Sequence, residues 1–289
     1  MRKIERKSLL YKSGVEYADY CINHVEGCSH GCKFPCYAMM MKKRCGVIED
    51  YNEWIKPKIV DNALDLLEKE IPKLKNKIKV VHLCFTTDPF MHKQPEIIDL
   101  TLKIIERLNK DNIKCTVLTK GIYPKELTNT EKYGKNNEYA ITLVSLNKKF
   151  REEFEPGTAP YLERIKSLNY LHKNGLKTWV SMEPYPTPNL VNQDLPNILK
   201  KIYFVNKIVF GKLNYNVQSN QSKYDYKGDF YEDRADEVIN FCQKNNIRYH
   251  IKHGTKKKNN NKTVKIFNCN SSIRTHHTIK SSVQASLTI

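Results

Sequence analysis

Cys28-Ser-His-Gly-Cys32-Lys-Phe-Pro-Cys36-Tyr37 places three cysteines within nine residues of one another. Three thiolates so close on one loop can ligate a metal centre, and three ligands for a four-iron cluster leave one iron without a protein ligand. Such an iron can bind a substrate or cofactor directly, which would make the site chemical rather than structural. Two alternatives stay open: a zinc site that lacks its fourth ligand in this loop, and cysteines that only fill space.

The cysteine loop directly follows the first of a series of short β-branched runs. Such runs predict strands at residues 20–25, 80–85, 113–119, 139–144, 177–182, 207–210 and 248–252. Between them, apolar residues at three- and four-residue spacing predict helices at residues 58–70, 96–110, 161–174, 195–204 and 233–245. Pro57 and Pro72 fit the start and the end of the first helix. Asn174-Gly175 fits a left-handed cap at the end of the third.

This alternation of strands and helices predicts an α/β fold. Repeated strand–helix units form parallel sheets with right-handed crossovers. About six units suit a barrel better than a flat doubly wound sheet, so we expect a parallel (β/α)6-type partial TIM barrel. In such barrels the loops at the carboxyl ends of the strands converge on the active site. The cysteine loop would lie at this rim.

The composition favours a soluble domain with reduced thiols. Of 289 residues, 40% are hydrophobic and 28% are charged, and no apolar run is long enough to span a membrane. The basic start of the chain leads into no apolar stretch, so we expect no secretory signal and a cytoplasmic protein. Nine cysteines, an odd number, then point to metal binding or catalysis rather than to disulfides.

The charge of the chain is strongly positive, with a formal net value of +18. Residues 256–289 contain six lysines, one arginine and no acidic residue. We therefore divide the chain into a domain at residues 1–255 and a short basic C-terminal tail at residues 256–289, which we expect to be disordered because it lacks apolar periodicity. A basic surface favours nucleic acid as a partner. A general excess of Lys, Asn and Ile offers a second explanation for the charge.

Further motifs lie near the ends of the other predicted strands. They are Thr86-Thr87-Asp88-Pro89-Phe90, Leu118-Thr119-Lys120, Ser145, Phe154-Glu155-Pro156, Arg164, Glu183-Pro184 and His250-Ile251-Lys252-His253-Gly254. Together with the cysteines they resemble the radical S-adenosylmethionine (SAM) superfamily, and more narrowly its spore photoproduct lyase-like branch, over roughly residues 19–254. One feature departs from the family: three residues separate Cys32 from Cys36, where two are usual. Pro35 presets the bend of this longer arm, which can still direct Cys36 to the cluster.

The resemblance implies a cofactor pair and a reaction. Cys28, Cys32 and Cys36 would ligate three irons of a [4Fe–4S] cluster, and the amino and carboxylate groups of SAM would chelate the fourth. Electron transfer from the reduced cluster would cleave SAM and begin radical chemistry. An electron donor such as a flavodoxin or ferredoxin would reduce the cluster. The substrate is unidentified, with nucleic acid as the candidate, and no residue is identified as a catalytic hydrogen donor.

The same resemblance suggests residues that contact SAM. They are Tyr37, Thr86, Thr87, Asp88, Lys120, Ser145, Asn147, Glu183, Gly211 and Asn214. The Thr86–Asp88 segment would receive the methionine ammonium and Lys120 its carboxylate, while the others would face the ribose, the adenine or the substrate. Structural alternatives stay open for most of them. These are a turn at Asp88, a solvated lysine, a helix cap at Asn147, plain turns at Gly211 and Asn214, and core packing of Tyr37.

A second class of function is a zinc- or cluster-containing, non-catalytic nucleic-acid-binding protein. Its zinc ligands would be the three cysteines with His30 or His24. His30 has two further interpretations, as a hydrogen-bond donor near the metal centre or as an exposed loop residue. The strand–helix pattern argues against this class, since zinc-stabilised domains are generally small and this chain can build its own core.

Overall fold

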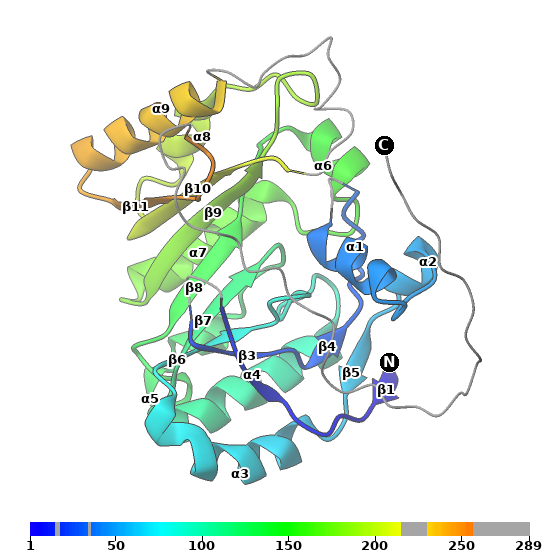
Figure 1. Ribbon diagram of the computed structural model, residues 1–289. Helices are drawn as coiled ribbons and strands as arrows, with labels where there is room; N and C mark the ends of the chain where they lie inside the picture. Colours follow the sequence, from blue (N-terminus) through cyan, green and yellow to red (C-terminus); the bar gives the residue numbers. More distant parts are fainter. Residues whose placement is uncertain (15–17, 34–35, 215–229, 257–289) are drawn as a thin grey trace, which may run out of the picture.

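The computed structural model describes residues 1–14, 18–33, 36–214 and 230–256. Its main sheet has eight strands in the order β11-β10-β9-β8-β7-β6-β3-β2 (Figure 1). The strands are β2 Leu10–Lys12, β3 Tyr20–Ile22, β6 Val80–Leu83, β7 Lys114–Thr119, β8 Glu138–Thr142, β9 Lys177–Tyr185, β10 Lys207–Lys212 and β11 Arg248–Ile251. Every pairing is parallel except that of β2 with β3, which is antiparallel.

The parallel sheet confirms the predicted α/β class and agrees with the predicted partial barrel, but the number of strands in the described residues differs. Seven parallel strands are present, one more than a (β/α)6 barrel contains. Among the described residues the edge strands β11 and β2 do not pair with each other, so the barrel is open. The carboxyl ends of all seven parallel strands share one edge of the sheet, where side chains from distant parts of the sequence can meet.

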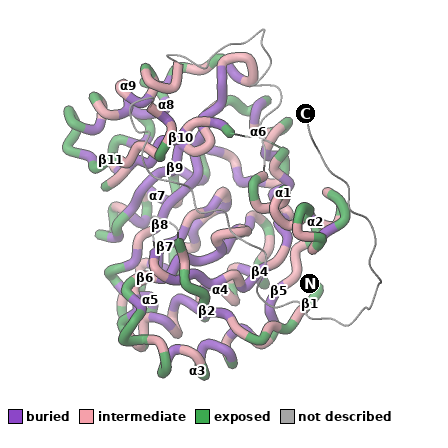
Figure 2. The backbone as a smooth tube through the Cα atoms, viewed as in Figure 1, coloured by how far each residue is buried: buried purple, intermediate pink, exposed green. Residues whose placement is uncertain are grey.

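Helices cover the sheet and close the core. They are α3 Ala63–Leu74, α4 Pro95–Lys110, α7 Tyr161–Lys173, α8 Leu195–Lys201 and α9 Phe230–Lys244. Four of them match predicted helices closely, because their buried residues recur at three- and four-residue spacing, as in Ile97, Ile104 and Leu108 of α4. Gly175, with a φ of +81°, ends α7 in the left-handed conformation that was predicted. Figure 2 shows strands buried along most of their length and helices exposed on one side.

The predicted helix at residues 58–70 is wrong at both ends. Lys58–Val60 forms strand β5, and α3 begins only at Ala63. Pro57 therefore precedes a strand, and Pro72 lies inside the last turn of α3 instead of after it. Ile59 and Val60 are buried, and pairing with neighbouring strands overrides the helical spacing of this segment.

Strand β5 is the centre of a second, smaller sheet in the order β1-β5-β4. Strand β1 (Arg2–Ile4) pairs with it in parallel and β4 (Val25–Glu26) pairs antiparallel. The single strand predicted at residues 20–25 is thus two strands in two sheets, separated by Asn23 and His24. The cysteine loop leaves the end of β4.

Shorter elements complete the chain. They are α1 Tyr37–Arg44, α2 Tyr51–Trp54, α5 Thr130–Tyr133, α6 Lys148–Phe154 and the 3₁₀ turns η1 Lys75–Lys77 and η2 Lys125–Thr128. Figure 1 shows α1 and α2 above the small sheet. No helix in the described part of the chain is long and apolar enough to cross a membrane. Of the predicted tail only Lys256, which pairs with Asp236, is described, and residues 257–289 lie outside the described residues.

Candidate metal centre

The cysteine loop contains two positions that require glycine. Gly27 has a φ of +79°, and a Cβ at this position would lie 2.8 Å from the Trp54 carbonyl oxygen. The Cys28 amide donates to that same oxygen at 2.8 Å. Gly31 has a φ of +55°, and the Tyr51 hydroxyl donates to its carbonyl at 2.7 Å. The end of β4 and helix α2 thereby fix the first half of the loop.

The loop brings three reduced thiols together. Cys28 is buried, Cys32 and Cys36 are partly exposed, and none of them forms a disulfide. Burial is the main reason why the pKa of each thiol is raised, to about 12 for Cys32. Asp88 and the other two thiols raise the pKa of Cys28 further. The three sulfur atoms are therefore close enough for their charges to interact.

Three free thiols on one loop fit an iron–sulfur cluster as its ligands. In the described ranges of the chain, no three His, Cys, Asp or Glu side chains are arranged to hold one metal ion. The irons of such a cluster lie at separate corners, so each thiolate would ligate a different iron. The unusual spacing falls at residues 34–35, which lie outside the described residues.

His24, one proposed zinc ligand, is buried in the core, and both of its ring nitrogens face other residues there. Its Nε2 lies 2.7 Å from Thr101 Oγ1. That hydroxyl donates to the carbonyls of Pro89 and Ile97, at 2.6 and 2.8 Å, so it accepts a hydrogen bond from Nε2–H. Nδ1 faces Cys84 Sγ at 3.5 Å. Burial, with a smaller effect of Arg6, lowers the pKa of His24 to about 3, so the ring is neutral at neutral pH.

His30 is buried rather than exposed, and it supports the loop. Its Nε2 accepts a hydrogen bond of 2.8 Å from the His92 amide. The ring proton is therefore on Nδ1, which lies 3.4 Å from Asp88 Oδ2. Both nitrogens of His30 have partners outside the thiol group, so the zinc alternative gains no fourth ligand from either histidine.

The Asp88 carboxylate joins the ends of two strands to the cysteine loop. It accepts hydrogen bonds from the Thr119 hydroxyl at 2.6 Å, the Lys120 amide at 2.7 Å and the Phe90 amide at 3.0 Å. Burial raises the pKa of Asp88, but the nearby His30 and these hydrogen bonds outweigh it and the net pKa is lowered. Such complete internal bonding favours the turn interpretation of Asp88 over contact with the ammonium of SAM.

The segment after α6 packs directly against the cysteine loop. The Lys33 amide donates to the Phe154 carbonyl at 2.7 Å, and the Gly157 amide donates to the His30 carbonyl at 3.0 Å. A Cβ at position 157 would lie 2.1 Å from the Ser29 carbonyl oxygen. Gly157 is therefore required by the close approach of two backbones.

Lys120 follows β7 and is enclosed, not solvated. Its Nζ lies 2.6 Å from Glu155 Oε1 and 3.5 Å from Cys32 Sγ. Burial lowers the pKa of Lys120, but Cys32 and Glu155 raise it more and the net pKa is raised. Burial likewise raises the pKa of Glu155, whereas Lys120 and Arg164 lower it to about 2. Glu155 and Arg164 are both fully buried, 3.1 Å apart.

Four other candidates for SAM contact have internal partners. The Thr86 hydroxyl donates to Asn23 at 3.1 Å, and the Thr87 hydroxyl donates to the Val25 carbonyl at 3.3 Å. Ser145 is buried and its Oγ accepts from the Asn147 amide at 3.0 Å. Asn147 caps α6, as the alternative interpretation predicted.

The last four candidates differ in exposure, and all but Tyr37 lie far from the thiols in the sequence. Tyr37 is exposed at the start of α1, and Asn214 is exposed after β10. Gly211 lies within β10, which excludes the alternative of a plain turn there. A Cβ on Gly211 would lie 2.9 Å from Glu183 Cγ and 3.0 Å from Lys252 Cγ, which places Gly211 between these two side chains.

Sequence reasoning missed several residues that hold the loop. Tyr51, His92 and Gly157 contact it through single hydrogen bonds, and the Ser29 amide donates to Met91 Sδ at 3.1 Å. Only Gly157 carried a signal, because it directly follows the Phe154-Glu155-Pro156 motif. The other residues are far from the loop in the sequence, and the spacing of residues along the chain does not indicate that they contact it.

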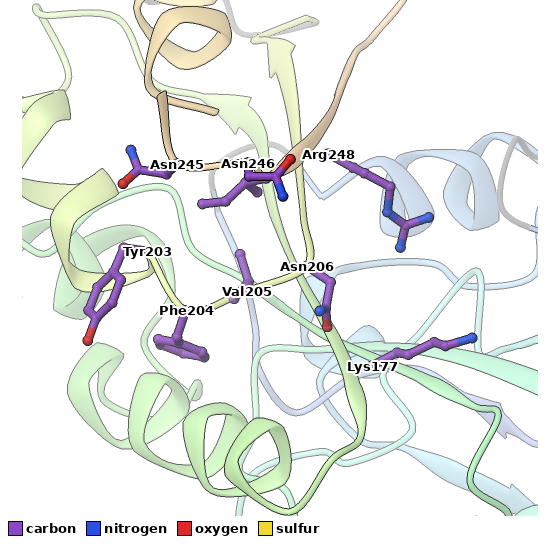
Figure 3. Close-up of a pocket in the computed structure, with 9 residues that line it drawn as sticks. Lys177, Tyr203, Phe204, Val205, Asn206, Asn245, Asn246 and Arg248 are labelled. Carbon is purple, nitrogen blue, oxygen red and sulfur yellow. The ribbon is translucent and has the colours of Figure 1, made fainter. Parts of the chain in front are cut away.

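A groove of about 520 Å³ lies at the opposite end of the sheet (Figure 3). Lys177, Asn206 and Arg248, at the amino ends of β9, β10 and β11, line it together with residues that follow α8 and α9. Positive charge near the carboxyl ends of helices is favourable by itself, so the two cations need no ligand to explain them. Within the described residues, none of the predicted site residues lines this groove.

Comparison with known proteins connects this arrangement to a family. The family profile described as the Radical SAM superfamily matches residues 22–202. An uncharacterized protein, ORF301, of Acidianus two-tailed virus is 27% identical over 201 residues, which cover 65% of this chain and 64% of that protein. The chain thus spans less than two thirds of this relative's length.

Solved structures of spore photoproduct lyase share the fold. The enzyme complexed with a dinucleoside spore photoproduct superposes with a TM-score of 0.63 and 13% identity, covering 86% of this chain and 80% of that one. A mutant with bound AdoMet and the same dinucleoside gives a TM-score of 0.62 at 13% identity, with the same coverage. At this level of identity the likeness establishes the architecture alone.

Proposed function

The chain belongs to the radical SAM superfamily, and from this premise we propose that it is an enzyme that cleaves SAM with a [4Fe–4S] cluster held by Cys28, Cys32 and Cys36. One observation carries the proposal. The three free thiols share a single loop at the carboxyl edge of the parallel sheet, and the Lys120 ammonium lies 3.5 Å from Cys32 Sγ there.

When bound, the cluster supplies one electron to SAM, and the cleavage of SAM starts radical chemistry on the substrate. The protein's own part is to hold the loop and exclude water. Tyr51 and Gly157 fix the loop backbone, and His30 anchors it to Asp88.

For SAM itself we propose contacts at the same edge of the sheet. Glu183 and Gly211 lie at the carboxyl ends of β9 and β10, and both are next to Lys252. The Glu183 carboxylate suits the hydroxyl groups of ribose, and the backbone at Gly211 suits the edge of adenine. Four other candidates have side chains that bond internally, so they would contribute to SAM binding only by holding the backbone around the site in place. They are Thr86, Thr87, Ser145 and Asn147. Tyr37 and Asn214 are exposed and remain candidates at the mouth.

The test is anaerobic purification, reconstitution with iron and sulfide, and then reduction with SAM, with 5′-deoxyadenosine as the measured product. We expect about four irons per chain and cluster-dependent cleavage of SAM. Cys36→Ala should abolish both. Cys242→Ala is the matched control, because Cys242 is a buried cysteine of α9 that lies outside the cysteine loop.

Three results would overturn the proposal. Stoichiometric zinc in place of iron would favour the non-catalytic binding protein. A full cluster without any SAM cleavage, in the presence of candidate substrates, would leave a cluster-bearing protein that is not an enzyme of this class. Equal activity of Cys36→Ala and Cys242→Ala would remove Cys36 from the ligand set.

Nucleic acid is the proposed substrate class, and an acidic low-potential electron carrier such as a flavodoxin or ferredoxin the proposed reductant. The net charge of +18 supports both, because a basic surface attracts polyanions and acidic proteins. If nucleic acid binds, its affinity falls steeply as the salt concentration rises. Fluorescence anisotropy with labelled single- and double-stranded oligonucleotides at two salt concentrations measures this, and binding that is absent or insensitive to salt contradicts the substrate class.

A further inference from the structure

In the buried ionic chain beside the thiols, two cations share one carboxylate. Arg164 and Glu155 are both fully buried, and their side chains pair at 3.1 Å, so their charges cancel. Lys120 adds a second cation at 2.6 Å from the other oxygen of Glu155. Its side chain is only 18% exposed, so water does not neutralise it as it would on the surface.

The other acidic group near Lys120 is Asp88, which contacts the backbone of Lys120 rather than the ammonium. Asp88 accepts a hydrogen bond from the Lys120 backbone amide, but its carboxylate faces the His30 ring and three neutral donors. The Lys120 ammonium itself contacts Cys32 Sγ at 3.5 Å. Because Lys120 shares Glu155 with Arg164, the second negative partner of its ammonium is Cys32, whose sulfur carries a negative charge when it is a metal ligand.

We infer that Lys120 is a positioning residue that acts through Cys32: its ammonium balances the ligating thiolate and raises the reduction potential of the cluster. The inference rests on the proposed function, since it requires the cluster to be bound. A cation close to a ligand stabilises the electron that the cluster accepts from its external donor, because reduction makes the centre more negative. Hydrogen bonds and charges around the ligand sulfurs are known to set such potentials.

This role differs from the one that the sequence suggested for Lys120, which is binding the carboxylate of SAM. A lysine that binds SAM changes the affinity for SAM and leaves the cluster unaltered when SAM is absent. A lysine that acts on Cys32 changes the potential without any SAM. A redox titration of the SAM-free cluster therefore separates the two roles.

The experiment compares three variants of the reconstituted full-length chain by potentiometric titration, monitored by electron paramagnetic resonance. We expect a more negative midpoint potential for Lys120→Met and a value close to that of the unaltered chain for Lys120→Arg, which keeps the charge. Lys114→Met is the control. Lys114 lies at the other end of the same strand and pairs with Glu138 at 3.0 Å, so its loss should leave the potential unchanged.

Glu155→Gln independently tests the direction in which local charge shifts the midpoint potential. Removing this negative charge leaves Lys120 less compensated, so the midpoint potential should shift in the positive direction. If Lys120→Met binds no cluster while Lys120→Arg does, the requirement for positive charge is supported by iron content alone.

Two outcomes would overturn the inference. One is an unchanged potential in a fully loaded Lys120→Met variant. The other is an equal shift in Lys120→Met and Lys114→Met. Failure of the unaltered chain to bind iron and sulfide would instead refute the proposed function, and the two failures are thus distinguishable.

Discussion

The backbone amide of Gly157 donates a hydrogen bond of 3.0 Å to the carbonyl of His30. The two segments approach so closely there that a Cβ on residue 157 would lie 2.9 Å from His30 Cα. This contact joins the segment before α7 to the middle of the cysteine loop. Because Cys28 and Cys32 flank His30 at two residues on either side, the position of Gly157 determines where both sulfur atoms lie.

Gly157→Ala should therefore displace the loop. The new methyl group would lie 2.1 Å from the Ser29 carbonyl oxygen, which is backbone and cannot rotate away. We expect a loss of about 1–3 kcal/mol in the free energy of unfolding and a strong decrease in iron bound per chain. Urea denaturation and iron analysis measure the two effects.

Gly175→Ala is the control for Gly157→Ala. Gly175 also requires glycine, with a φ of +81°, but no atom lies within 4 Å of a Cβ there. Gly175→Ala should lower the free energy of unfolding by about 1 kcal/mol and leave iron binding intact. Equal iron content in the two variants would mean that the contact with His30 does not position the cysteines.

The buried pair of Arg164 with Glu155 should matter far more for stability than any exposed pair. Arg164→Met leaves the Glu155 carboxylate in the core with only one cation, and removing one member of a buried pair costs about 3–5 kcal/mol. Lys103→Met, which breaks an exposed pair with Asp99, should change the free energy of unfolding by no more than about 0.5 kcal/mol. Similar denaturation midpoints for the two variants would show that the buried network is dispensable.

The parallel strands of the main sheet, four of the helices and the grouping of the thiols on one loop were predictable, because these features depend on local sequence. β-Branched runs mark β6 to β10, and the spacing of Ile97, Ile104 and Leu108 marks α4. Strand β5 was not predictable in this way. Lys58–Val60 is extended because it pairs with Arg2–Ile4 across more than fifty residues, and nothing in its own spacing indicates this.

The environment of the site was harder to predict than its residues. His30 looks like an exposed loop residue in the sequence, yet it is buried because Asp88 and the His92 amide occupy both ring nitrogens. Lys120 looks equally suited to solvent or to SAM, and only the fold brings Glu155 and Cys32 to it. These contacts join residues that are far apart in the sequence. The pattern of a single sequence carries little information about which distant residues will pair.

His24 should make the chain less stable in acid. Its folded pKa of about 3 is below the ordinary value of 6.5, so between these values the unfolded chain binds a proton that the folded chain does not. Stability is thus fully present above pH 6.5 and is lost as the pH falls toward 3, by about 2 kcal/mol at pH 5. His24→Gln should flatten this dependence in urea denaturation between pH 7.5 and 5. The exposed His253→Gln should leave it unchanged, and parallel curves for all three proteins would contradict the assignment.

Gly211 offers a way to alter the proposed SAM site without touching the cysteines. In Gly211→Ala the new Cβ would lie 2.9 Å from Glu183 Cγ and 3.0 Å from Lys252 Cγ, so both side chains must move. They are flexible, so the loss of stability should be only about 1 kcal/mol. If Glu183 contacts SAM, its displacement should weaken SAM binding about tenfold, equivalent to ~1.4 kcal/mol.

Equilibrium dialysis of SAM against the reconstituted variants measures this affinity, and iron analysis confirms that Gly211→Ala keeps its cluster. Gly175→Ala, far along the chain at the end of α7, should bind SAM as the unaltered chain does. A Gly211→Ala variant that retains both its iron and its full affinity for SAM would remove Glu183 and Gly211 from the SAM site. The candidates would then narrow to residues nearer the thiols, since the ends of β9 and β10 would no longer take part in binding.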